Sequence, residues 1–167
     1  LDVSASMGGE YLEIGSLLGL AALKKSPESM FLCFGSELKR PNVDVNDTVM
    51  TNMERCREVF GGGTDTGLCI QHLLGTIGSG RGRNRWGGSG YASDFPESEK
   101  TNAPVKVDNI VIVTDEQQNS GSPVVSLFRE YRKKANPNAK MFIIDVAPYH
   151  LRMANPDEPG VTFIYGW

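Results

Sequence analysis

The sequence has no long apolar run, few cysteines and no excess of basic residues. No uninterrupted apolar stretch in its 167 residues approaches the roughly 20 residues of a membrane-spanning helix, so we expect no membrane partner. The formal net charge of −3 argues against a surface that coats nucleic acid, although it is compatible with local basic patches. The three cysteines, Cys33, Cys56 and Cys69, form no Cys-x-x-Cys pair. We therefore expect buried free thiols in a reducing, cytoplasmic compartment.

The length and the ordinary composition predict a single globular domain over residues 1–167, with enough chain for a sizeable core. Strand-like sequence begins at Leu1 with no recognisable leader, and we expect a fragment of a longer protein, trimmed at both ends. Residues 78–106 form a long insertion rich in Gly and Ser. A loop of that length inside a domain is functional or disordered.

Apolar periodicity predicts four helices and six strands. Spacings of three and four residues predict helices over residues 10–25, 48–60, 68–77 and 123–134. Short apolar runs predict buried strands over residues 30–34, 110–113, 141–146 and 161–165, and the opening residues indicate the end of another strand. Residues 37–43 contain Pro41, which favours an edge strand. This order predicts an α/β fold with a doubly wound, mostly parallel six-stranded sheet, one antiparallel edge strand and helices on both faces.

The first turn of the chain carries three oxygen-bearing side chains at alternate positions. Asp2, Ser4 and Ser6 follow strand-like sequence and precede two glycines and a helix. Carboxylate and hydroxyl oxygens are hard ligands of the type that Mg²⁺, Mn²⁺ and Ca²⁺ accept. One carboxylate and two hydroxyls cannot fill an octahedral shell. Other segments must therefore contribute, and one position must remain for water or an incoming ligand.

Two later segments carry further hard oxygens in suitable places. Thr64 follows a run of three glycines, and Asp115 stands at the carboxyl end of a predicted strand, the edge where doubly wound sheets bind ligands. Both also have an ordinary structural explanation, because Thr64 or Asp65 can cap the next helix and Asp115 can cap a turn. For Asp65 and Glu116 we expect supporting contacts with the site and no direct ligation.

The pattern Asp-x-Ser-x-Ser after a strand resembles the opening of the metal-ion-dependent adhesion site of von Willebrand factor A domains. This resemblance implies that Thr64 and Asp115 complete a metal site with Asp2, Ser4 and Ser6. It also implies a divalent cation, Mg²⁺ first and Mn²⁺ or Ca²⁺ as alternatives. In that family the open position of the metal is taken by an acidic group of a protein partner.

The chain is similar, more narrowly, to the A domain of the Ro (TROVE) autoantigen proteins, in a bacterial or phage version. The similarity is carried by segments spread over nearly the whole chain: residues 1–7, 62–65, 114–115, 129–134 (Arg-Glu-Tyr-Arg-Lys-Lys) and 155–160. In Ro proteins a ring of helical repeats binds small Y RNAs, and the A domain follows that ring. The ring is absent from this sequence, so the resemblance implies Y RNA as a partner of the longer protein through its missing repeats.

We therefore expect a non-catalytic, metal-dependent interaction domain, and two other functions stay open. One is Mg²⁺-dependent phosphoryl transfer with Asp2 as nucleophile. Against it, Ser4 occupies the place where related phosphatases carry a general acid, and the two histidines, His72 and His150, lie far from the motif. The other is direct RNA contact through four residues of the insertion, for which a solvated loop tip is the simpler explanation. These residues are Arg81, Arg83, Arg85 and Trp86.

Overall fold

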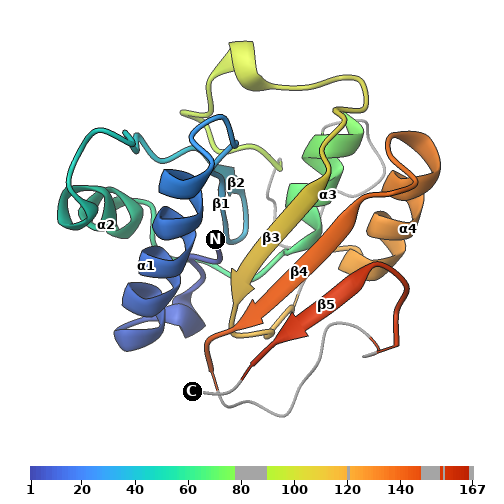
Figure 1. Ribbon diagram of the computed structural model, residues 1–167. Coiled ribbons are helices and arrows are strands. Elements are labelled where there is room, and N and C mark those ends of the chain that lie inside the picture. The colour runs from blue at the N-terminus through green and yellow to red at the C-terminus, as the bar shows by residue number, and fades with distance from the viewer. Residues whose placement is uncertain (78–89, 120, 148–154, 156, 166–167) are drawn as a thin grey trace.

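The larger sheet of the protein is parallel and has the strand order β3-β4-β5 (Figure 1). Its strands are Asn109–Thr114 (β3), Lys140–Asp145 (β4) and Val161–Ile164 (β5). The computed structural model describes residues 1–77, 90–119, 121–147, 155 and 157–165. Asn109 pairs with Lys140 and Thr114 with Asp145, so β3 and β4 end at the same edge.

A smaller antiparallel pair continues this sheet through the first residues of the chain. Strand β1 (Cys33–Phe34) pairs with β2 (Leu38–Lys39). Between β1 and β3 lies the segment 1–3, in which Asp2 N donates to Val113 O (2.8 Å) and Val3 N to Phe34 O (2.9 Å). The predicted count of six strands is therefore corrected to five in the described residues. The segment 1–3 is bonded on both sides but turns away at Ser4, too early to form a ladder.

The other predicted strands of this region are also shorter than expected. Only the last two residues of the run 30–34 form a strand, and β2 ends at Lys39, before Pro41. Strand β2 is not a free edge, because Leu38 N donates to Gly90 O (2.6 Å) and Ala92 N donates to Leu38 O (2.8 Å). The described part of the insertion thus extends the sheet.

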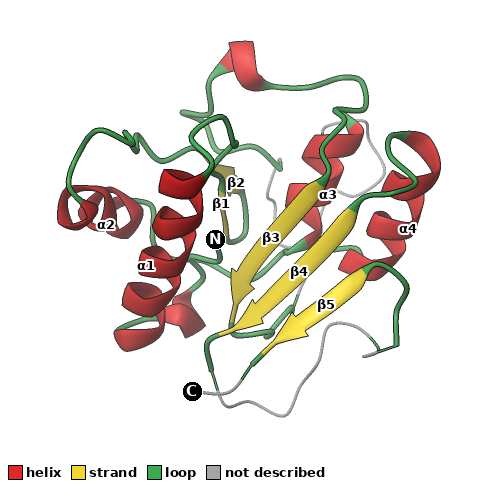
Figure 2. Cartoon of the chain, viewed as in Figure 1, coloured by secondary structure: helices red, strands yellow, loops and turns green. Residues whose placement is uncertain are grey.

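Four α-helices cover the two faces of the sheet (Figure 2). They are α1 (Glu10–Lys25), α2 (Val49–Glu58), α3 (Gly67–Leu74) and α4 (Val124–Lys134). Successive side chains of β3 point to opposite faces, so Ile112 packs with α3 and α4 while Val113 packs with α1. The prediction of helices on both faces is confirmed. None of the described helices is long and apolar enough to cross a membrane.

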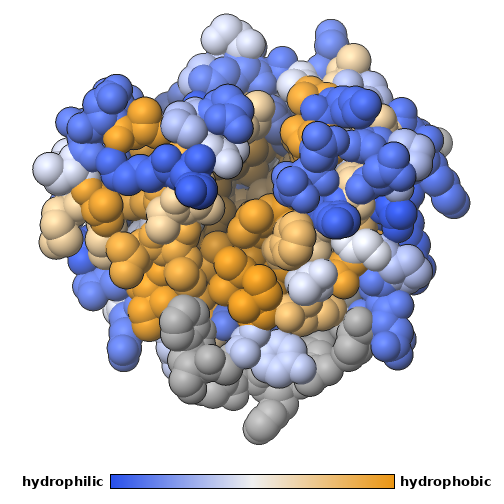
Figure 3. All heavy atoms as spheres, in the orientation of Figure 1, coloured by the Kyte–Doolittle hydropathy of each residue, from blue (hydrophilic) through white to orange (hydrophobic). Residues whose placement is uncertain are grey.

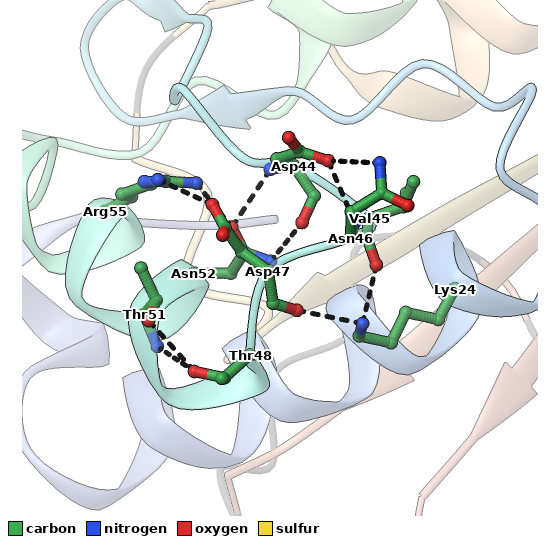
Figure 4. Close-up of polar contacts among 9 residues, drawn as sticks. All are labelled: Lys24, Asp44, Val45, Asn46, Asp47, Thr48, Thr51, Asn52 and Arg55. Carbon is green, nitrogen blue, oxygen red and sulfur yellow. Dashed lines mark hydrogen bonds and ion pairs between the residues drawn. The ribbon is translucent and has the colours of Figure 1, made fainter.

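A polar turn before α2 fixes this helix against α1 (Figure 4). The buried Asn52 accepts a hydrogen bond from Asp44 N (3.0 Å) and donates one to Asp44 O (2.7 Å). Lys24 of α1 donates to the carbonyl oxygens of Val45 (2.7 Å) and Asp47 (3.0 Å). The turn therefore sets the direction of α2, whose C-terminal end leads into the Gly-rich loop 61–63.

The basic end of α4 makes structural contacts. Arg129 Nε donates to Glu158 Oε1 (2.7 Å), and Arg132 donates to Pro137 O and Pro159 O, both at 2.9 Å. The pairing with Arg129 lowers the pKa of Glu158. Two of the segments that carry the Ro resemblance, 129–134 and 155–160, are thus joined by an ion pair.

Apolar side chains gather on the face of the molecule shown in Figure 3, over β3 and β4 and the adjoining part of α1. Two residues of the α1 face of the sheet, Val111 and Ile164, are 44% and 47% exposed. Helices α3 and α4, on the opposite face, bury their side of the same strands. Within the described residues, the two faces are therefore unequally covered.

His72, a residue of α3, is fully buried in the core as a neutral ring whose contacts define its tautomer. Its Nε2 lies 3.2 Å from Met30 Sδ and its Nδ1 lies 2.9 Å from Tyr91 Oη. Because a thioether sulfur can only accept, Nε2 carries the proton and Nδ1 accepts from the Tyr91 hydroxyl. Burial lowers the pKa of His72, with a smaller opposing effect of Glu99 and a smaller reinforcing effect of Arg40.

We expect the protein to lose stability as the pH falls through 6.5, the ordinary pKa of histidine. Below that pH the unfolded chain binds a proton at His72 that the folded chain does not, so acid favours unfolding. The slope for one proton is at most about 1.4 kcal/mol per pH unit. Urea unfolding of the wild type and His72→Gln between pH 5 and 8 measures it. Identical pH dependence in both proteins would contradict the prediction.

Candidate metal centre

The Asp2 carboxylate is fixed at the carboxyl edge of the sheet by two hydrogen bonds. Asp2 is fully buried, its Oδ1 accepts from Ser4 N (2.9 Å) and its Oδ2 accepts from Thr114 Oγ1 (2.6 Å). Thr114 is the last residue of β3, so the strand that carries Asp115 also orients Asp2. Each carboxylate oxygen keeps a second lone pair for another partner.

The two serines of the motif lie side by side in the turn that follows. Ser4 is buried and precedes a short 3-10 helix (Ala5–Met7) that contains Ser6, which is partly exposed. Their hydroxyl oxygens are 3.1 Å apart. The turn therefore presents two neighbouring hydroxyls next to the Asp2 carboxylate.

The Gly-rich loop reaches this turn through its main chain. Gly61 N donates to Val3 O (2.7 Å), and Ala5 N donates to Gly62 O (2.9 Å). A Cβ atom on Gly35 would lie 2.8 Å from Gly61 O, so the loop can approach β1 only because position 35 has no side chain. These contacts place the buried Thr64 beside the opening motif.

Asp115 is fully buried and its two oxygens have different surroundings. Oδ1 accepts a hydrogen bond from Gln117 N (3.1 Å), as expected for a turn cap. Oδ2 is buried and accepts no hydrogen bond from the described residues. The next residue, Glu116, is also buried and has a left-handed backbone (φ 59°), a conformation that costs a non-glycine residue about 1 kcal/mol. Strain and an unsatisfied acceptor therefore coincide in this loop.

The charge balance of the centre is negative. Asp2 and Asp115 are both fully buried, and no Lys, Arg or His of the described chain forms an ion pair with either. Burial raises the pKa of Asp2, hydrogen bonds from Thr114 and Ser4 oppose this, and the charge of Asp115 adds to it. Asp145, at the end of β4, also has a raised pKa, mainly through burial and partly through Asp115. A cation at this edge would relieve an uncompensated negative charge.

The oxygen-rich ligand set fits a hard divalent cation, with hydroxyls supplying most of the ligands. Within the described part of the chain, no group of three or more His, Cys, Asp or Glu side chains is placed to hold a metal ion. The residues that would hold Mg²⁺ are the five named from the sequence: Asp2, Ser4, Ser6, Thr64 and Asp115.

The other candidate residues named from the sequence lie either in the loops of the centre or outside the described residues. The residue before α3 is Thr66, whose side chain makes no capping hydrogen bond. Asp65 and Glu116 are both buried in the loops of the centre, which is compatible with the supporting role expected for them. The four candidate RNA contacts in the insertion, and His150, lie outside the described residues.

Sequence reasoning missed three residues that hold the loops of the centre. Thr114 bonds Asp2, Ser36 Oγ accepts from Gly63 N (2.7 Å), and Asn119 Oδ1 accepts from Thr64 N (3.1 Å). Thr114 could have been noticed as a hydroxyl directly before a strand-end Asp. Ser36 and Asn119 bond the main chain of another loop, for which the sequence carries no pattern.

Comparison with known proteins supports the fold. No protein-family model matches the chain, and no curated protein matches it. Among solved structures, the Ro (RSR) protein of Deinococcus radiodurans aligns over 99% of this chain, with a TM-score of 0.62 and 15% identity. The chain has the fold of that part of the Ro protein. The expected resemblance, a von Willebrand factor A-like fold as in Ro proteins, is confirmed at the level of the fold.

The matched region is 30% of the Ro chain, so this chain spans less than a third of the length of that relative. Two crystal structures of the proximal thread matrix protein 1 of the mussel byssus also align with this chain. Their TM-scores are 0.49 and 0.48, their identities 15% and 13%, and they cover 98% and 99% of this chain and 41% of their own.

Proposed function

We propose that this chain is a non-catalytic interaction module that holds a divalent cation, Mg²⁺ in the first place, and through it binds an acidic group of a protein partner. The observation that carries the proposal is the buried pair Asp2 and Asp115, which has no cationic partner in the described chain. Burying an unpaired carboxylate costs several kcal/mol. When bound, the cation supplies positive charge and an open coordination position for the partner's carboxylate.

The state of Asp2 favours binding over phosphoryl transfer. The hydrogen bonds from Ser4 and Thr114 hold the two oxygens of the buried Asp2 carboxylate in place, so the group is not free to turn toward a phosphorus atom. These contacts suit a ligand held in one orientation. We therefore assign Asp2 to metal binding and assign the chain no catalytic residue.

The biological setting that we propose is a Ro-like, RNA-binding ribonucleoprotein of the cytoplasm. The fold of the Ro (RSR) protein and the Ro-like segments support this setting. In it, small Y RNA would bind helical repeats outside this chain, and the module would recruit a protein. Direct RNA contact through the insertion stays the alternative, since its four candidate residues lie outside the described part of the chain.

Titration of metal-free protein with Mn²⁺, followed by electron paramagnetic resonance, tests the proposal. We expect one bound Mn²⁺ per chain and competition by Mg²⁺. A peptide with a single Glu should then bind only in the presence of the metal, whereas the same peptide with Gln should not. Absence of Mn²⁺ binding, or equal binding of both peptides, would refute the proposal. Metal-dependent hydrolysis of p-nitrophenyl phosphate that is lost in Asp2→Asn would establish the enzyme instead.

A further inference from the structure

The loop that carries Thr64 and the loop that follows Asp115 contact each other along their length. Thr64 N donates to Asn119 Oδ1 (3.1 Å), and Asn119 N donates back to Thr64 O (3.2 Å). Asn119 thus bonds both the main-chain N–H and the main-chain carbonyl oxygen of Thr64. This reciprocal pair joins two segments that are far apart in the sequence.

Two glycines bring the same loops into closer contact. A Cβ atom on Gly121, whose φ is +78°, would lie 1.9 Å from Asp65 Oδ1, and a Cβ atom on Gly67 would lie 2.7 Å from Ser122 O. The main chain at Gly121 therefore packs on the Asp65 side chain, and Gly67, the first residue of α3, packs on the main chain of Ser122. Together with the Thr64–Asn119 pair, these contacts fix the distance between the loops.

Asn119 is exposed, although the amide that it bonds belongs to the buried Thr64. Its side chain contributes nothing to the apolar clusters of the fold. Removing it should therefore leave the core intact while freeing the main chain of Thr64. If a coordinating residue must become ordered when the cation binds, the affinity for the cation is lower, because the cost of ordering is subtracted from the binding free energy.

We propose that Asn119 is a positioning residue of the metal centre, an inference that rests on the proposed function above. By holding Thr64 to the loop after Asp115, Asn119 sets the separation of two ligands that come from different loops. It does not touch the cation. Its contribution is the prior ordering of the Thr64 hydroxyl relative to Asp115.

Mn²⁺ affinities of three variants test this role. Loss of a residue that orients a ligand typically weakens metal affinity 10- to 100-fold, and we expect a loss of roughly that size in Asn119→Ala. Asn119→Asp keeps an oxygen acceptor for Thr64 N and should restore the affinity. Asn138→Ala, an exposed Asn in the turn between α4 and β4, should bind as the wild type does.

Amide hydrogen exchange of the metal-free protein gives a readout that does not involve the cation. The Thr64 amide should exchange faster in Asn119→Ala than in the wild type, and the core amides of β3 should not change. Wild-type affinity in Asn119→Ala, no rescue by Asn119→Asp, or unchanged exchange at Thr64 would each overturn the positioning role alone. If the wild type itself binds no Mn²⁺, the proposed function fails, and this inference fails with it.

Discussion

Replacing Asp115 by Asn is expected to abolish divalent-cation binding without destabilising the metal-free protein. The two effects have one cause. Asp115 Oδ2 is buried and accepts no hydrogen bond from the described chain, and its charge acts on the buried Asp2. Neutralising Asp115 removes its repulsion of Asp2 in the metal-free protein, and it also removes the second carboxylate that a cation needs.

The expected change in the free energy of unfolding distinguishes Asp115→Asn from an ordinary core substitution. Replacing a buried carboxylate that has a charged partner usually costs about 3–5 kcal/mol of stability. For Asp115→Asn in metal-free protein we expect no loss of stability, or a gain of up to about 1 kcal/mol. A ligand present at 100 times its Kd stabilises the folded state by about 2.7 kcal/mol. The wild type should show that increase with Mg²⁺ and Asp115→Asn should not.

Urea unfolding in EDTA and in saturating Mg²⁺ measures both effects in one experiment, with Mn²⁺ titration as the direct binding assay. Asp94→Asn, which neutralises an exposed carboxylate elsewhere, is the matched control and should behave as the wild type does. If Asp115→Asn binds Mn²⁺ with unchanged affinity, the cation does not use Asp115. If it unfolds far more easily in EDTA, the charge of Asp115 is structurally compensated in the folded protein.

The helices could be predicted well because their signals are local. Helix α1 has the bounds expected from its apolar spacing and from Ser26-Pro27 after it, and α4 begins one residue after its Pro123. Helix α3 ends three residues earlier than predicted, because Gly75 adopts a left-handed conformation (φ 67°) that closes it. Periodicity alone does not say which glycine will end a helix.

Strand lengths and loop contacts could not be predicted because they depend on distant partners. The run 30–34 is apolar throughout, but only Cys33 and Phe34 find a ladder partner in β2. The opening motif of the centre is contiguous and was visible, whereas Asn119 acts by bonding Thr64, which lies in another loop. A pattern in one segment cannot reveal a hydrogen bond whose acceptor or donor is set by the fold.

Gly75→Ala should be among the most destabilising substitutions in the chain. Gly75 ends α3 with φ 67°, a left-handed backbone that costs other residues roughly 1–2 kcal/mol. A Cβ atom at this position would also lie 2.3 Å from Ala103 N and 2.6 Å from Asn102 C. Because these are main-chain atoms, they cannot turn aside as a side chain would, and such overpacking adds about 1–3 kcal/mol. We expect a total loss of roughly 2–5 kcal/mol in the free energy of unfolding, measured by urea denaturation.

Gly75→Asn distinguishes the two causes, because Asn tolerates the left-handed conformation but has the same Cβ atom. The segment 101–105 is held against α3 by Val105 N, which donates to Leu73 O (2.7 Å), so it has little freedom to withdraw. If contact with the main chain dominates, Asn should be nearly as destabilising as Ala. Recovery of most of the stability by Asn would show instead that backbone conformation is the main cost and that the segment 102–103 can move away from α3.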